Sequence, residues 1–238
     1  MSDSDPNLDE IKSFYDDVYY ADTDKPMQGS AHLRGLAGKT RVVAGEAVLD
    51  VACGRGEWLL VCHDLGATVA GVDLSDRAIE FCKKHLPVGD FHAVPAESLP
   101  YGDSTFDVVS CLGSLEHFVD PVIAMKEMVR VAKPDARFLL LVPNADFLTR
   151  KLGLFGGTDQ KDAKEVVRTL EEWERLFSAA GLSISSIWKD LHVLSWSWIT
   201  MNGWLAAPLR AVQALLLPLW PMRWQYQVYH LCEVTQQK

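Results

Sequence analysis

The chain has 238 residues, of which 48% are hydrophobic and 23% charged, enough for one α/β domain with a sizeable core. Its formal net charge of -9 argues against a nucleic-acid partner, because phosphates call for a basic surface, and against attachment to anionic lipid by charge alone. The five cysteines are odd in number, form no Cys-x-x-Cys pair and follow no signal peptide, so we expect reduced thiols in a cytoplasmic protein.

The first thirty residues are acidic and aromatic, and FYDDVYY at 14–20 predicts helical turns that lie over the domain. Beyond them, short apolar strands alternate with helices. Strands are expected at 47–52, 68–74, 91–94, 106–112, 137–143, 182–188 and 227–234. Helices are expected at 56–66, from Ser75 to about Leu86, at 121–133 before Pro134, and at 170–181. This alternation predicts an α/β fold with a mostly parallel sheet that is covered on both faces.

The stretch LDVACGRGEWLL at 49–60 carries the chain from the first strand through two glycines into a helix. In such sheets a ligand binds beyond the carboxyl ends of the strands, where the strand order reverses. A P-loop is excluded because no Lys-Ser/Thr pair follows Gly56. A dinucleotide-binding turn is disfavoured because Leu59 occupies the position of its third glycine and because Glu57 would face the pyrophosphate.

Two acidic residues at strand ends indicate a ligand without phosphates. Asp73 ends the second strand, where a carboxylate can accept two hydrogen bonds from a ribose diol. Asp50 ends the first strand and could meet an ammonium group. A nucleoside with an amino-acid tail, S-adenosylmethionine (SAM), fits both.

Four stretches in order carry a family resemblance: VLDVACGRG (48–56), GVDLS (71–75), VPAESLPYGDSTFDVVSCLGSLEHFVDP (94–121) and RFLLLVPN (137–144). They resemble the successive motifs of the class I SAM-dependent methyltransferases, in the group that includes quinone-biosynthesis C-methyltransferases and many small-molecule O-methyltransferases. The resemblance implies a Rossmann-like, doubly wound, seven-stranded sheet whose last strand is antiparallel. It covers about residues 45–188 and the final strand.

The resemblance also implies the cofactor contacts. Asp73 would hold the ribose hydroxyls, with Leu74 against the adenine. Ala96 would offer its backbone N–H to the adenine ring beside Glu97, and the carbonyl of Leu112 would approach the methionine amino group. The loop around the methionine would consist of Asp50, Ala52, Cys53, Gly54 and Gly56.

Two positions depart from the family pattern. Ala52 stands where the family often has glycine. Pro95 stands where the family often has an aspartate that accepts from the adenine amino group, and proline offers no side-chain acceptor. The adenine contacts are therefore expected to differ from those of the family.

Glu116 and His117, in SLEHFVD, are the candidate catalytic pair. Methyl transfer needs a general base only when the nucleophile arrives protonated, as a hydroxyl does. His117 either takes that proton or is a structural feature of the family. The N-terminal segment commonly folds over the active site in the family, so residues of this segment would lie close to the substrate; the candidates are Tyr15, Tyr19, Tyr20 and His32. Arg34 either pairs with the methionine carboxylate or lies on a solvated helix face. No metal site is expected.

An unusual apolar insertion of about forty residues separates the last two strands. It includes Trp196, Trp198, Trp204, Trp220 and Trp224, and from 193 to 209 it has no charged residue. Prolines and polar residues interrupt it, so a membrane span is not expected. It could pack against the core, cover the substrate as a lid, form a dimer surface, or dip into a membrane interface, where tryptophan is favoured.

The expected organisation is an N-terminal helical cover (1–44), a SAM-binding core (45–190), the insertion (191–225) and a final core strand (226–238). The expected activity is methyl transfer to a small or lipid-linked metabolite, O-methylation ahead of C-methylation. The alternatives are a non-catalytic SAM-binding regulatory or scaffolding subunit and, less favoured, an NAD-dependent oxidoreductase. The expected location is cytoplasmic, with peripheral membrane contact and a homodimer left open.

Overall fold

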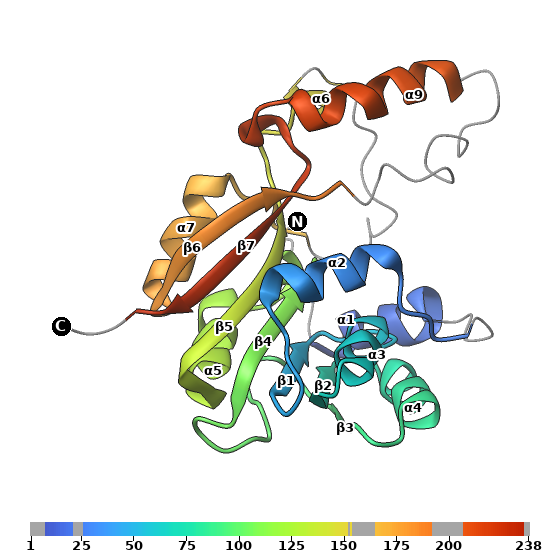
Figure 1. The fold of residues 1–238 in the computed structure, drawn as a ribbon, viewed down its shortest axis with the longest axis vertical. Coiled ribbons are helices and arrows are strands. Elements are labelled where there is room, and N and C mark those ends of the chain that lie inside the picture. The colour runs from blue at the N-terminus through green and yellow to red at the C-terminus, as the bar shows by residue number, and fades with distance from the viewer. Residues whose placement is uncertain (1–7, 21–25, 152, 154–164, 192–206, 236–238) are drawn as a thin grey trace, which may run out of the picture.

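A single seven-stranded sheet organises the protein, as Figure 1 shows for the computed structural model, which describes residues 8–20, 26–151, 153, 165–191 and 207–235. The strand order is β3-β2-β1-β4-β5-β7-β6. Only β7 runs antiparallel to its neighbours. The strands are β1 (Ala47–Val51), β2 (Thr68–Asp73), β3 (Asp90–Ala93), β4 (Phe106–Leu112), β5 (Ala132–Pro143), β6 (Leu182–Lys189) and β7 (Gln227–Val234). The expected Rossmann-like, doubly wound sheet with an antiparallel last strand is confirmed.

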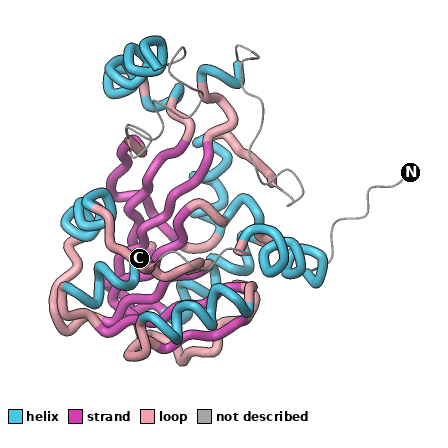
Figure 2. The backbone as a smooth tube through the Cα atoms, turned by 90° about the vertical axis from the view of Figure 1, so that its right-hand side faces the viewer, coloured by secondary structure: helices cyan, strands magenta, loops and turns pink. Residues whose placement is uncertain are grey.

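Helices cover both faces of the sheet (Figure 2). One face packs against α2 (Ala31–Thr40), α3 (Glu57–Asp64) and α4 (Asp76–His85). The other packs against α5 (Pro121–Val131) and α7 (Leu170–Ala179). The chain order reverses between β1 and β4, which pair directly, so the switch point lies at their carboxyl ends.

Side-chain caps fix where the helices begin. Ser75 accepts a hydrogen bond from the backbone N–H of Ala78 at the start of α4. Asp120 accepts from two backbone N–H groups at the start of α5, and Pro121 follows at a position where its missing N–H costs nothing. Thr169 and Glu172 form a reciprocal capping box at the start of α7. These local signals were visible in the sequence.

The boundary between α5 and β5 differs from the expected one. The helix was expected to reach Lys133, but it ends at Val131 and β5 already begins at Ala132. Pro134 disfavours helical geometry in the residue before it, so Lys133 is extended. Its ammonium group then reaches the carboxylate of Asp107, with Nζ–O distances of 2.7 and 2.8 Å. The early strand start is therefore held by a contact with β4.

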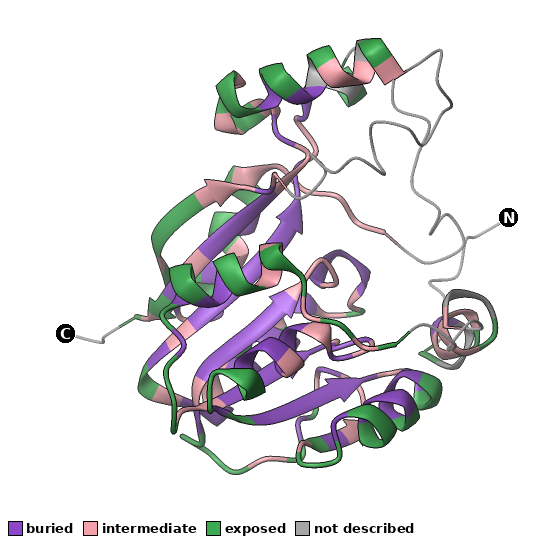
Figure 3. Ribbon diagram, turned by 45° about the vertical axis from the view of Figure 1, so that its right-hand side comes forward, coloured by how far each residue is buried: buried purple, intermediate pink, exposed green. Residues whose placement is uncertain are grey.

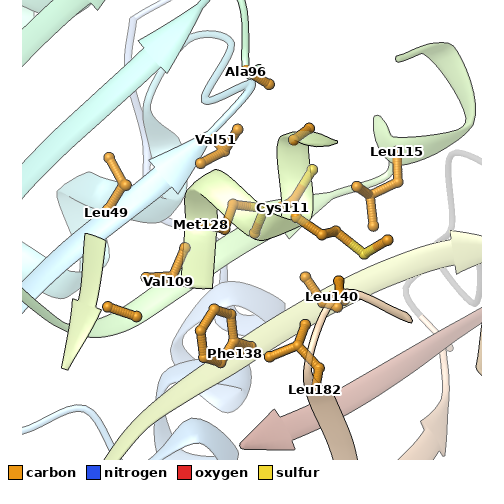
Figure 4. Packing of buried hydrophobic residues seen from close by; sticks show 14 of the residues in the cluster. Leu49, Val51, Ala96, Val109, Cys111, Leu115, Met128, Phe138, Leu140 and Leu182 are labelled. Atoms are coloured by element: carbon orange, nitrogen blue, oxygen red, sulfur yellow. The ribbon is translucent and has the colours of Figure 1, made fainter. Parts of the chain in front are cut away.

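Apolar side chains pack closely between the sheet and α5 and hold this helix against the sheet. Figure 4 shows Leu49, Val109, Met128, Phe138 and Leu140 gathered there, all fully buried. Trp173 of α7 is buried in the same cluster and donates from Nε1 to the carbonyl of Pro143 over 2.8 Å. This core holds the carboxyl ends of β4 and β5 in place.

The remaining elements flank the sheet. The N-terminal cover comprises α1 (Leu8–Phe14) and a π-helical turn, η1 (Tyr15–Tyr19). The short helix α6 (Leu148–Lys151) follows β5. Most of the apolar insertion's first half, 192–206, lies outside the described residues; its second half forms α9 (Ala207–Leu216) and the 3-10 turns η3 (Leu217–Leu219) and η4 (Met222–Trp224). No described helix combines the length and apolar character needed to cross a bilayer.

Candidate cofactor site

A cavity of about 370 Å³ lies beyond the carboxyl ends of β1, β2 and β4, at the switch point. Ten of the twelve residues named from the sequence line it: Asp50, Ala52, Cys53, Gly54, Asp73, Leu74, Ala96, Glu97, Leu112 and His117. Gly56 and Glu116 lie next to lining residues but do not line the cavity themselves. Positions spread over about seventy residues of sequence thus meet at one edge of the sheet.

The turn after β1 holds three left-handed residues, Ala52 (φ 60°), Gly54 (φ 52°) and Gly56 (φ 71°). A Cβ atom at Gly54 would lie 2.8 Å from the hydroxyl oxygen of Tyr20, so this position has no room for a side chain. Gly56 is the N-cap residue of α3. At Ala52 and Gly54 the turn therefore brings backbone close against the cavity.

Asp50 lies at the end of β1, 3% exposed, and its side chain faces Ser110 of β4. The Ser110 hydroxyl donates to Asp50 Oδ1 over 2.6 Å and accepts from the indole Nε1 of Trp58 over 2.9 Å. Burial raises the pKa of Asp50 to about 8, although the hydrogen bond from Ser110 acts in the opposite direction. A cation in the cavity would favour the ionised form of this carboxyl group.

Asp73 ends β2 and bridges the two loops that border the cavity. Its Oδ2 accepts from the backbone N–H of Gly54 and its Oδ1 from that of Ser75, each over 2.9 Å. Burial raises its pKa, while these backbone hydrogen bonds lower it and the nearby charge of Asp16 raises it further. Each oxygen keeps a lone pair for a further hydrogen bond, so the carboxylate is oriented and still able to accept.

Part of the cavity wall is mostly apolar. It includes Leu74, Val94, Pro95 and Ala96 from the ends of β2 and β3. Glu97 accepts a hydrogen bond from the backbone N–H of Asp120 over 3.3 Å, which ties this wall to the start of α5. A flat aromatic ring fits such a wall, since its side chains offer area and few polar groups.

His117 and Glu116 lie in a 3-10 turn after β4 (η2, Leu115–His117) and are 7% and 4% exposed. His117 lines the cavity. Glu116 does not line it, and its Oε2 has no hydrogen-bond partner among the described residues. Burial raises the pKa of Glu116 to about 7, with a contribution from the charge of Glu165. Of the pair, only His117 is placed to meet a substrate in the cavity.

The N-terminal cover forms one side of the cavity through Leu8, Ile11, Tyr15 and Tyr20. The sequence offered the two tyrosines as candidates but gave no motif for the two aliphatic residues. Their i, i+3 spacing on α1 is the signal that could have found them. His32 and Arg34 do not line the cavity.

A set of polar contacts fastens this cover to the loop after Asp73. Asp16 Oδ1 accepts from the Ser75 hydroxyl over 2.5 Å and from the Arg77 backbone N–H over 3.3 Å. The ammonium group of Lys12 lies 3.0 Å from the carbonyl oxygen of Leu74 and 3.1 Å from Asp16 Oδ2. We call the contacts of Lys12 and Asp16 with residues 74–77 the latch.

The acidic side chains that line the cavity are Asp50, Glu57, Asp73 and Glu97, against one arginine, Arg55. An excess of acids suits a ligand that carries positive charge. Among the described residues, no group of three or more His, Cys, Asp or Glu could hold a metal ion. The fold and the site together define an α/β protein with an acid-lined cavity at its switch point, where sheets of this kind bind their ligands.

Comparisons with known proteins indicate to which family this α/β protein belongs. The methyltransferase domain family matches residues 49–140. The methyltransferase YcgJ of Bacillus subtilis is 32% identical over 182 residues, which are 71% of this chain and 70% of that protein. A ubiquinone biosynthesis O-methyltransferase of Pseudomonas fluorescens is 30% identical, over 69% of this chain and 75% of that protein.

A solved structure agrees in fold. The 1,6-didemethyltoxoflavin-N1-methyltransferase of Burkholderia thailandensis, with bound S-adenosylhomocysteine, superimposes with a TM-score of 0.62 at 18% identity, over 96% of this chain and 87% of that one. The chain belongs to the SAM-dependent methyltransferase family, and its cofactor is SAM. SAM as the cofactor is thereby confirmed, and the less favoured alternative of an NAD-dependent oxidoreductase is set aside.

Proposed function

We propose that this methyltransferase transfers the methyl group of SAM to a hydroxyl group of a small or lipid-linked acceptor. The observation that carries the proposal is that His117 lines the same cavity as Asp50 and Asp73. Bound SAM would supply an electrophilic methyl group, and the protein would align the acceptor and exclude water.

The proposed cofactor contacts are those that the family resemblance implies, and they use residues that line the cavity. Asp73, held by two backbone N–H groups, would accept from the ribose hydroxyls. Asp50 would pair with the ammonium group of the methionine part, beside the backbone of Ala52, Cys53 and Gly54. Leu74, Ala96 and Glu97 would contact the adenine, the carbonyl of Leu112 would approach the amino group, and Gly56 would shape the turn without touching the ligand.

His117 would act as the general base that takes the proton of the acceptor hydroxyl. Glu116 does not line the cavity, so we assign it no contact with the acceptor. A hydroxyl oxygen must lose its proton when it accepts the methyl group, so a base beside the cavity supports O-methylation.

The names of relatives support the acceptor class. They include ubiquinone biosynthesis O-methyltransferases and a demethylmenaquinone methyltransferase of Renibacterium salmoninarum, which is 32% identical over 57% of this chain and 60% of that protein. Both names refer to quinones, and an acceptor of that kind combines an aromatic hydroxyl with an apolar tail.

The proposal can be tested with radiolabelled SAM and a lipid extract of the source cells, with mass analysis of the labelled product. We expect an O-methylated apolar product. His117→Gln should lower kcat by about 10²–10⁴-fold with SAM affinity unchanged, since a general base contributes about that factor. A product labelled on a carbon atom, or full activity of the His117→Gln variant, would overturn the proposed chemistry. If the protein bound SAM but transferred no label to any compound, it would be a non-catalytic subunit.

A further inference from the structure

The outer side of α9 and η3 is an exposed apolar surface. Its members are Val212, Leu215, Leu216 and Leu219, which are 53%, 77%, 45% and 78% exposed. They follow one another at steps of three, one and three residues, which places them on one side of a helical segment. We call these four side chains the apolar ridge. Large apolar side chains gathered in this way mark an interaction site more often than isolated ones do.

The ridge is held in place by contacts on its inner side. Ala214 and Leu217 are buried, at 8% exposure each. The side-chain amide of Gln225, itself buried, donates to the carbonyls of Leu217 and Trp220 over 2.9 and 3.3 Å. Lys189 donates from Nζ to the carbonyl of Pro218 over 2.5 Å. The protein therefore presents the ridge on a segment that is fastened to its body.

The base of this segment is fastened to the end of β5. Asn144, fully buried, donates from Nδ2 to the carbonyls of Arg223 and Gln225 over 2.9 and 3.1 Å. Because β1, β4 and β5 are parallel, the segment lies beyond the same edge of the sheet as the cofactor cavity. Figure 3 shows α9 apart from the buried strands, with exposed and partly buried residues alternating along it.

The stretch that contains the ridge differs in charge from the chain as a whole. Residues 191–232 include Arg210 and Arg223 and no lysine, aspartate or glutamate, although the chain as a whole has a net charge of -9. Five of the eight tryptophans also fall in this stretch. The nearby α6 adds Arg150, which is exposed, while its Lys151 pairs with Asp146 over 2.9 Å. The stretch that carries the ridge is therefore positive on an acidic protein.

This combination fits one kind of partner. Exposed leucines beside arginine and tryptophan, without acids, are the composition of segments that lie in the interface of a bilayer. Positive charge complements the anionic lipid headgroups that would repel the remainder of the protein. The described helix is too short to span a bilayer, which leaves attachment to its surface.

We propose that the apolar ridge, with Arg223, docks this methyltransferase onto an anionic membrane surface. The leucines enter the boundary between headgroups and acyl chains, and Arg223 contacts lipid phosphates. The cavity then faces the membrane from which an apolar acceptor would come; only this last consequence rests on the proposed function.

Flotation with vesicles tests the proposal on the full chain. Phosphatidylcholine vesicles are compared with vesicles that also contain phosphatidylglycerol, at low and high salt. We expect binding to the anionic vesicles that weakens with salt. The double variant Leu215→Ser/Leu219→Ser should bind about tenfold or more weakly, because two exposed leucines no longer enter the lipid. Arg223→Gln should lose affinity for the anionic vesicles only.

The matched control is Val43→Ser/Val88→Ser, which alters two valines that are 56% and 67% exposed away from the ridge. It should bind vesicles as the wild type does. Calorimetry with SAM should give the same affinity for both double variants, which shows that both are folded. Failure of the wild type to bind SAM would overturn the proposed function and leave the flotation result standing.

Two outcomes would overturn the docking proposal. One is a wild-type protein that does not float with anionic vesicles, or a Leu215→Ser/Leu219→Ser variant that floats as well as the wild type. The other is a wild-type dimer, measured by light scattering, that this variant converts to a monomer without any vesicle binding. That result would make the ridge a contact between two copies of the chain.

Discussion

Ser110 donates a hydrogen bond from its hydroxyl to Oδ1 of Asp50 over 2.6 Å, and the two residues are also direct partners in the pairing of β1 with β4. The register of the two strands therefore places the Ser110 hydroxyl beside the buried carboxyl group of Asp50 at the switch point. Asp50 is kept largely protonated near neutral pH because burial raises its pKa to about 8. A bound ammonium group would reverse this preference.

Replacing Asp50 by asparagine should weaken SAM binding and stabilise the protein without ligand. Folding raises the pKa of Asp50 from 3.8 to about 8, so the native state binds more protons between those values. The free energy of unfolding therefore falls as pH rises through that window. At pH 8 we expect Asp50→Asn to be more stable than the wild type in urea denaturation, by a difference that shrinks as the pH falls towards 4. The control is Asp64→Asn, an exposed acid; equal stability of Asp50→Asn and wild type at pH 8 would contradict the argument.

The affinity for SAM should rise with pH. Below a pKa of about 8, the free protein must release a proton from Asp50 before the carboxylate can pair with a cation. The expected gain approaches about tenfold per pH unit between about pH 6 and 7. Calorimetry in buffers of different ionisation enthalpy would detect the released proton. A flat pH profile in the wild type, or the same slope in Asp50→Asn, would show that Asp50 does not meet the ammonium group.

Breaking the latch should speed the release of SAM. Asp16 joins η1 to Ser75 and Arg77, and the same cover lines the cavity through Tyr15 and Tyr20. Asp16→Ala removes these contacts, and we expect the dissociation rate of SAM to rise by about 3–10-fold, because roughly 1 kcal/mol of hydrogen bonding is lost. Stopped-flow tryptophan fluorescence would measure the rate.

The matched control for the latch is Asp17→Ala, since Asp17 is exposed and its nearest approach to Arg77 is 3.6 Å. It should leave the dissociation rate unchanged. If Asp16→Ala released SAM at the wild-type rate, the cover would not hold the ligand in place.

Replacing Ala52 by glycine should stabilise the protein. Ala52 has φ of 60°, a conformation that costs an L-residue about 1–2 kcal/mol and glycine far less. The greater freedom of glycine in the unfolded chain offsets part of this gain, so we expect about 0.5–1 kcal/mol in urea denaturation with SAM affinity retained. A loss of stability would mean that the methyl group of Ala52 packs more favourably than the strain costs.

Local sequence patterns determined much of the fold. β4 and β7 match the expected ranges residue for residue. Their short length and their aromatic and β-branched residues favour a strand over a helix. The glycine turn and Asp73 lie at strand ends that the sequence also marked. Helix starts at Ser75, Asp120 and Thr169 depend on side chains within three residues.

The tertiary structure decided contacts between residues that are far apart in the chain. Ser110 reaches Asp50, Asp16 reaches Ser75 and Asn144 reaches Arg223 across 60, 59 and 79 positions. Only the tertiary structure separated His117, which lines the cavity, from Glu116, which does not. Propensity and periodicity act over a few residues, whereas these contacts depend on strand register and on how the elements pack, which no short window of sequence contains.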